Sequence, residues 1–158
     1  MATRHCYLFA LEVKSMQPGD IYNELPLHCT LMHRFWSEFE PDVLAEKLRD
    51  FFQEIQPIIL QPHERLLLGP KQVPVSELTL TEQLKKLHTG LYHRLNDLEV
   101  EYTAPEWVGD GYRAHVTERK NDRPEVGSEY VSKAIYLIEV KVPGHDHMRL
   151  VRHKFDLH

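Results

Sequence analysis

The sequence contains few cysteines and no long apolar run. Its two cysteines, Cys6 and Cys29, both stand inside apolar runs of strand length, so we expect reduced core residues rather than a disulfide or a metal pair. No apolar stretch is long enough to span a membrane, and the first residues do not show a basic segment followed by an apolar one. These absences predict a cytoplasmic protein without a membrane partner.

The sequence also lacks an excess of positive charge. It has 24 acidic and 19 basic residues and a formal net charge of -5. Nonspecific affinity for a long duplex comes mainly from neutralising many phosphates, so this balance argues against a general nucleic-acid-binding protein. Any nucleic-acid partner is expected to be a nucleotide or a short RNA or oligonucleotide, or to be bound only at its end.

Composition and length predict one folded domain. The 158 residues are 42% hydrophobic and 27% charged, which is ordinary for globular proteins. A chain of this length buries a sizeable core without disulfides. We therefore expect residues 1–158 to form a single, monomeric domain whose two small lobes share a core.

Hydrophobic periodicity predicts strands interrupted by two helices, which is the α+β class. The first helix begins at Pro41, is amphipathic, and ends before Pro57. The second follows the capping-box pattern Thr79-Leu80-Thr81-Glu82, and its leucines recur every three or four residues as far as Leu98. Strands are expected over residues 5–14, 27–35, 58–60, 66–68, 73–80, 112–119, 130–142 and 148–157.

Two triplets of the form His-x-Thr stand on strand-like segments: His28-Cys29-Thr30 and His115-Val116-Thr117. Alternate residues of a strand point to the same face. Each histidine therefore shares a face with its threonine, while the apolar residue between them faces the core. We predict that the two triplets face each other across one cleft.

Phosphodiester cleavage needs groups of this kind. Imidazole, with an ordinary pKa of about 6.5, can take a proton from the attacking oxygen or give one to the leaving oxygen. Threonine hydroxyls can donate to the nonbridging phosphate oxygens, and Arg113 and Arg119, which are in phase with the second triplet, can add charge-assisted contacts. The scheme requires no metal and no cofactor.

The motif His28-Cys29-Thr30-Leu31, followed much later by His115-Val116-Thr117, resembles the paired signature of the 2H phosphoesterase superfamily. This superfamily includes the RNA 2',3'-cyclic phosphodiesterases that are called 2'-5' RNA ligase-like proteins. Phe35 and Arg119 also resemble the ligase-like branch, whereas Glu118 stands where that branch usually carries an apolar residue.

The resemblance implies a bilobal fold. Two antiparallel sheets, related by pseudo-twofold symmetry, would surround a central cleft with the helices on the outside. It also implies that His28 and His115 exchange the acid and base roles and that Thr30 and Thr117 hold the phosphate. The expected function is a metal-independent hydrolase of a cyclic or terminal nucleotide phosphodiester, such as a 2',3'-cyclic phosphate or a 2'-5' linked oligonucleotide, in RNA processing or a related pathway.

Two other functions remain open at this point. The acidic net charge and Glu118 favour a noncatalytic module that binds a nucleotide or an RNA end on the same fold. A purely structural domain would require both triplets to be accidental. The substrate, the bond cleaved and the assignment of acid and base are not determined by the sequence.

The remaining histidines and tryptophans have competing interpretations. Trp107, in the loop before the second triplet, can stack on a nucleobase or serve as a packing anchor beside Pro105. His145, His147 and His153 could supply metal ligands, but they lack the spacing of a known metal motif, so we expect no metal site.

Three further histidines are expected outside the chemistry. His33 is out of phase with His28, which predicts that it faces the core side or a strand end. His88 and His93 lie five residues apart on the leucine-rich helix and do not share a face, so we expect solvent-facing or capping residues.

Overall fold

In the computed structural model, which describes residues 4–158, two helices separate runs of consecutive strands, as the α+β prediction requires. The strands are β1 (His5–Glu12), β2 (Ile21–Tyr22), β3 (His28–Ser37), β4 (Ile58–Leu60), β5 (Pro62–Leu68), β6 (Val73–Leu78), β7 (Glu101–Tyr102), β8 (His115–Thr117), β9 (Tyr130–Ser132), β10 (Ala134–Val140) and β11 (Arg149–Asp156). The helices are α1 (Pro41–Gln53) and α2 (Glu82–Asp97), with 3-10 turns η1 (Pro105–Trp107) and η2 (Gly109–Gly111) before β8. Within residues 4–158, no helix is long and apolar enough to cross a membrane.

Most strands belong to one antiparallel sheet, in the order β2-β11-β10-β1-β3-β8-β6-β5, and β7 pairs with β3. Its two halves meet where β3 pairs with β8, at Cys29 and Val116. The α+β class and the antiparallel arrangement are therefore confirmed. The two expected sheets are joined into one because the strands of the two triplets pair with each other, and the second sheet is the small β4–β9 pair.

Several predicted boundaries differ from the structure: β5 begins at Pro62 instead of residue 66, and β8 covers only three of the residues 112–119. The strand expected over 130–142 is interrupted at Lys133, because β9 leaves the large sheet to pair with β4. The cap of α2 is Thr81, whose side chain accepts a hydrogen bond from the backbone N–H of Leu84 at 3.2 Å. Thr79 lies two residues before this cap, and its N–H donates to the carbonyl oxygen of Gln61, which precedes β5.

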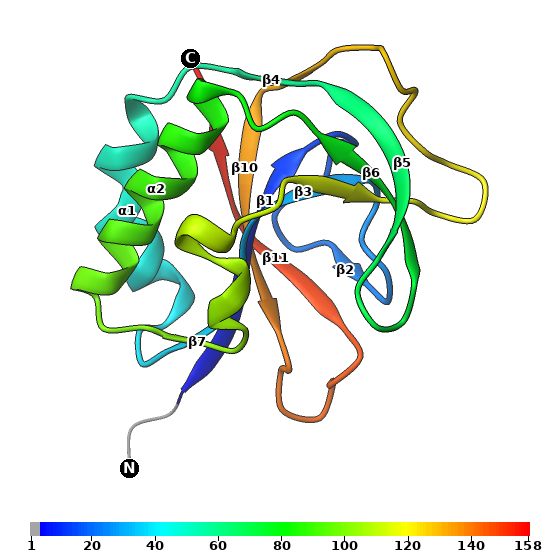
Figure 1. The fold of residues 1–158 in the computed structure, drawn as a ribbon. Helices are drawn as coiled ribbons and strands as arrows, with labels where there is room; N and C mark the ends of the chain where they lie inside the picture. The colour runs from blue at the N-terminus through cyan, green and yellow to red at the C-terminus, as the bar shows by residue number, and fades with distance from the viewer. Residues whose placement is uncertain (1–3) are drawn as a thin grey trace.

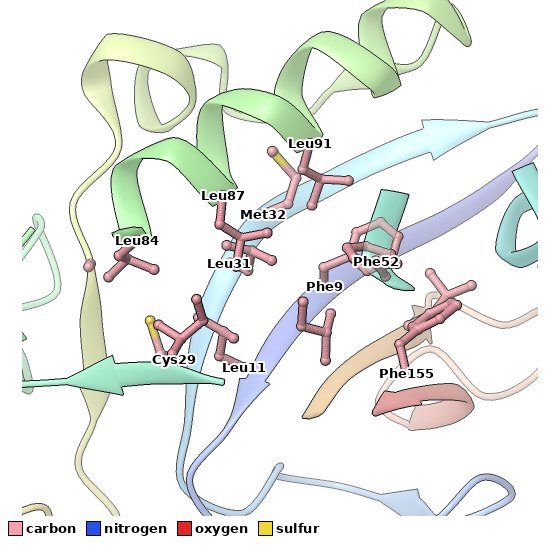
Figure 2. Packing of buried hydrophobic residues seen from close by; sticks show 14 of the residues in the cluster. Phe9, Leu11, Cys29, Leu31, Met32, Phe52, Leu84, Leu87, Leu91 and Phe155 are labelled. Carbon is pink, nitrogen blue, oxygen red and sulfur yellow. The ribbon is translucent and has the colours of Figure 1, made fainter. Parts of the chain in front are cut away.

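The helices lie side by side on one face of the sheet (Figure 1). On α2, a row of leucines that includes Leu84, Leu87 and Leu91 packs onto Leu31 and Met32 of β3 (Figure 2). Burying one leucine side chain contributes about 1.5–3 kcal/mol, so this row holds α2 firmly over β3. The first triplet is thereby presented on the face of β3 that the helices do not cover.

Candidate active site

The two triplets lie on neighbouring strands. Cys29 and Val116 are register partners, and their side chains are 0% and 1% exposed, so both project into the core. The residues on either side of them therefore project to the opposite face of the sheet. The predicted sharing of one face by each histidine and its threonine is thus supported by the burial of the residue between them.

The antiparallel register relates the triplets by an approximate twofold axis. Because Cys29 lies opposite Val116, His28 lies opposite Thr117 and His115 lies opposite Thr30. The two histidines are diagonal neighbours across the strand pair, a relation that separates Cα atoms by about 7–8 Å and Cβ atoms by somewhat less. Both imidazoles are therefore within reach of one phosphate.

Each catalytic candidate is held by its own backbone. The Nδ1 atom of His28 lies 2.9 Å from the carbonyl oxygen of Pro26, and that of His115 lies 2.9 Å from the carbonyl oxygen of Arg113. A carbonyl only accepts, so Nδ1 carries the proton in both rings and Nε2 is left with a free lone pair. The hydroxyl of Thr30 lies 3.3 Å from Nε2 of His28.

Burial keeps both imidazoles neutral in the absence of a bound anion. Burial, together with the nearby guanidinium groups of Arg119 and Arg149, lowers the pKa of His28 to about 4. Burial also lowers the pKa of His115, where the guanidinium group of Arg113 acts in the same direction and the carboxylate of Glu77 in the opposite one. The two histidines therefore share a geometry but differ in the charges around them.

The arginines that were predicted to bind phosphate have partners within the protein. Arg113 donates from Nε to Glu77 at 2.9 Å on the neighbouring strand β6. Arg119 lies beyond the end of β8, donates from Nε to the carbonyl oxygen of Leu25 at 2.7 Å, and pairs with Glu24 at 3.0 Å. Of the two, Arg119 is attached to the loop that leads into the first triplet.

His33 lies on the cleft side, and its expected core-side position is wrong. The register between β1 and β3 shifts before this residue, and Leu31 and Met32 are both buried in the core. A bulge of this kind reverses the alternation of faces, so residues after it are out of phase with residues before it. The ring centroid of His33 lies 6.5 Å from that of His115 and 6.1 Å from that of Trp107.

A cavity of about 310 Å³ adjoins the second triplet. One side is formed by His33, Trp107, His115 and Thr117, and the other by the hairpin that joins β5 to β6, over residues 68–75. Trp107 thus lines the same space as the second histidine and threonine, as the base-stacking interpretation requires.

His88 is also placed differently from its predicted position. Its side chain is 1% exposed, and its ring stacks on Tyr112 with centroids 3.9 Å apart. Nδ1 donates to the carbonyl oxygen of Leu31 at 2.8 Å, and Nε2 accepts from the N–H of Gly109 at 2.9 Å. His88 therefore connects α2 to the strand of the first triplet and to the turn before the second, while His93 is exposed as expected.

Glu118 faces away from the cleft. Its carboxylate forms a bidentate ion pair with Arg65 on β5, at 3.1 and 2.8 Å. This acidic residue therefore does not place a negative charge among the groups of the site. The departure from the family pattern is explained by a partner on the neighbouring hairpin.

The histidines near the C-terminus do not form a metal-binding group in the structure. The Nε2 atom of His153 lies 2.8 Å from a carboxylate oxygen of Asp42 of α1. Within residues 4–158, three possible ligand atoms come together only at His63, Glu64 and Glu77, where Glu77 is already engaged by the guanidinium group described above.

Comparison with solved structures shows that the fold is shared with a phosphoesterase, in agreement with the fold expected from the paired triplets. The chain is similar over 98% of its length to a phosphoesterase (99% of that chain, TM-score 0.67, 12% identity). It is also similar to TT0787 of Thermus thermophilus (96% and 97% of the two chains, TM-score 0.53, 19% identity) and to E. coli LigT complexed with NADP+ (97% and 97%, TM-score 0.57, 12% identity). No protein-family profile and no curated protein sequence matches this chain.

Proposed function

We propose that this chain is a metal-independent phosphodiesterase that hydrolyses a cyclic or terminal phosphodiester of a nucleotide. The observation that carries the proposal is the matched pair of imidazoles: His28 and His115 stand on paired strands, each with its Nδ1 proton on a backbone carbonyl. Such a pair offers two Nε2 atoms to one phosphorus. The fold shared with a phosphoesterase supports the same class of reaction.

The reaction divides into one proton removed and one proton donated. For a 2',3'-cyclic phosphate, the base takes a proton from water as the water oxygen bonds to phosphorus. The acid protonates the ribose oxygen as its bond to phosphorus breaks, which leaves a phosphate monoester and a free hydroxyl. The threonine hydroxyls of both triplets would donate hydrogen bonds to the nonbridging oxygens, where negative charge is concentrated.

The surrounding charges assign the two roles. Arg119 and Arg149 disfavour a proton on His28, and together with burial they keep it neutral, so we assign it as the base. At His115 the guanidinium group of Arg113 disfavours the proton, whereas the carboxylate of Glu77, its register partner, favours it. Because His115 has such a carboxylate beside it and His28 does not, we assign His115 as the acid. A bound phosphate anion raises the pKa of both rings and so helps to protonate the acid.

Two observations support nucleotides as the proposed substrates: one protein of this fold was solved in complex with a nucleotide, and Trp107 lines the site. The E. coli LigT structure is a complex with NADP+, and nucleotide binding by this chain is part of the proposal. Short substrates are proposed because the net charge of the chain is negative.

The test is product analysis on 2',3'-cyclic mononucleotides, 2'-5' linked oligoadenylates and cyclic dinucleotides. His28→Ala and His115→Ala are each expected to lower kcat by about 10²–10⁴-fold, because each removes one proton-transfer group. His93→Ala, on the exposed face of α2, is the matched control and should retain activity. Strong inhibition by EDTA with an unchanged circular dichroism spectrum would contradict the metal-independent mechanism.

A noncatalytic nucleotide or RNA-end binding module is the second candidate. It is favoured by the lowered pKa of both histidines, since neither ring carries a proton at neutral pH in the empty site. Calorimetry that shows tight binding of a 2',3'-cyclic nucleotide, without product after hours, would support this function over hydrolysis.

A further inference from the structure

The cavity beside the second triplet has the size and chemistry of a small-molecule pocket. Its volume of about 310 Å³ is at the lower end of the range of about 300–1,000 Å³ that ligand pockets usually have. It adjoins His115 and Thr117 directly, so a group that fills it would be attached to whatever is held by the triplets.

Much of the lining of the cavity is apolar. Trp107 forms one wall, and Leu68, Val73 and Val75 of the β5–β6 hairpin lie among the residues of the other. An indole face binds nucleobases by stacking, whatever the base, because every base has a π-face. A sugar or a phosphate would leave these apolar surfaces poorly covered, whereas a planar aromatic group covers them.

His33 adds a polar group to this apolar pocket. It is only partly exposed, next to the fully buried Met32, and it makes no side-chain hydrogen bond within residues 4–158. Burial lowers its pKa to about 4, so at neutral pH the ring is uncharged and offers one donor and one acceptor. The edges of nucleobases present the same two kinds of atom.

We propose that this cavity is a nucleobase subsite, in which Trp107 stacks on the base and His33 hydrogen-bonds to its edge. The inference rests on the proposed function and deepens it, because it names a nucleoside as the part of the substrate on the His115 side. With the base there, the remaining substituent of the phosphorus lies toward His28 and the guanidinium groups of Arg119 and Arg149. The substrate therefore binds in one direction across a site whose two triplets are related by approximate symmetry.

Fluorescence provides the direct test because the chain has two tryptophans. Trp36 lies on β3, where its ring contacts Arg4 and Lys141, and it does not line the cavity. The variant Trp36→Phe therefore leaves Trp107 as the only fluorescent tryptophan. Adenosine 2'-phosphate is expected to quench Trp107 emission to saturation, whereas inorganic phosphate is not. Binding of adenosine 2'-phosphate in calorimetry without a change in emission, or no binding at all, would overturn the subsite.

Kinetics provide the second test. Trp107→Ala is expected to lower kcat/KM for adenosine 2',3'-cyclic phosphate by about 5- to 150-fold more than for the baseless methyl ribofuranoside 2',3'-cyclic phosphate, since stacking of one base contributes about 1–3 kcal/mol. His33→Leu should raise KM for the base-bearing substrate, and His33→Asn, which keeps a donor and an acceptor, should restore part of it. Equal losses on both substrates would overturn the subsite while leaving the proposed hydrolysis intact. Quenching of Trp107 without hydrolysis of any substrate would support the subsite and contradict the proposed hydrolysis.

Discussion

Replacing the buried His88 with leucine is expected to destabilise the protein and to disturb both triplets from a distance. The ring holds the carbonyl group of Leu31, next to the first triplet, and the N–H of Gly109, in the turn that leads to the second. A carbonyl only accepts and an N–H only donates, so the ring must be neutral, with its proton on Nδ1. Leucine fills much of the space but satisfies neither backbone group.

The size of the loss follows from these two groups. A buried polar group left without a partner costs about 1–3 kcal/mol, so two of them cost about 2–6 kcal/mol. Leu31 is fully buried, but Gly109 is only half-buried, and water can replace the second bond. We therefore expect a loss of about 2–3 kcal/mol, which corresponds to a fall in Tm of about 4–12 °C for a chain of this length.

The same variant carries a pH signature. Burial lowers the pKa of His88 in the folded protein below the ordinary value of 6.5. The unfolded chain therefore takes up this proton first as pH falls, and the stabilisation by His88, complete above pH 6.5, declines from there toward the lowered pKa. The difference in unfolding free energy between wild type and His88→Leu should be largest at about pH 7.5 and smaller at about pH 5.

Urea denaturation at both pH values measures this difference. His93→Leu, on the exposed side of the same helix, is the matched control and should change stability by no more than about 0.5 kcal/mol. If His88→Leu lost no more stability than His93→Leu, or if its loss were the same at both pH values, the two-bond description of the neutral ring would be refuted.

Two other perturbations test the site. In the assigned roles His28 is the neutral base and its pKa is about 4, so kcat/KM should fall below about pH 4. His115 is the protonated acid and its pKa is lowered, so kcat/KM should fall again as pH rises through that lowered pKa, and it should already be declining at the ordinary histidine value of about 6.5. A profile that still climbs above pH 7 would contradict the assigned roles. In Gly111→Ala, the added Cβ would overlap the carbonyl oxygen of Glu106, so the turn must move. The free energy of unfolding, measured by urea denaturation, is expected to fall by about 1–3 kcal/mol, and the emission of Trp107 is expected to change. If both values were unchanged, the turn would accommodate the added Cβ without cost.

The sequence predicted the triplets well because they occupy regular strands. Cys29 and Val116 alternate with polar neighbours. Because side chains of a strand alternate between its two faces, this pattern predicts which residues face the core without any knowledge of the partner strands. His33 could not be placed in the same way. Its position depends on a bulge that forms when β3 pairs with β1, and an extra residue in one strand is visible only once the partner strand is known.

His88 shows a different kind of error, since the sequence did contain its position. It lies four residues after Leu84 and three before Leu91, which puts it on the leucine stripe that faces the sheet. The prediction of a solvent-facing or capping residue followed the usual exposure of histidine instead of this spacing. What the spacing could not supply is the pair of backbone groups that make burial of the ring tolerable, because Leu31 and Gly109 come from distant parts of the chain.

The approximate symmetry of the site explains why the motif alone does not assign acid and base. In each triplet Nδ1 lies against a carbonyl oxygen two residues earlier, which gives both rings the same tautomer, with Nε2 unprotonated. A difference in role must therefore come from residues outside the triplets. Arg119 and Arg149 beside His28 are such residues, and so are Arg113 and Glu77 beside His115. Only His115 has a carboxylate that favours its protonated form. The direction of catalysis is then a property of the neighbouring strands and loops, which can change while both triplets stay the same.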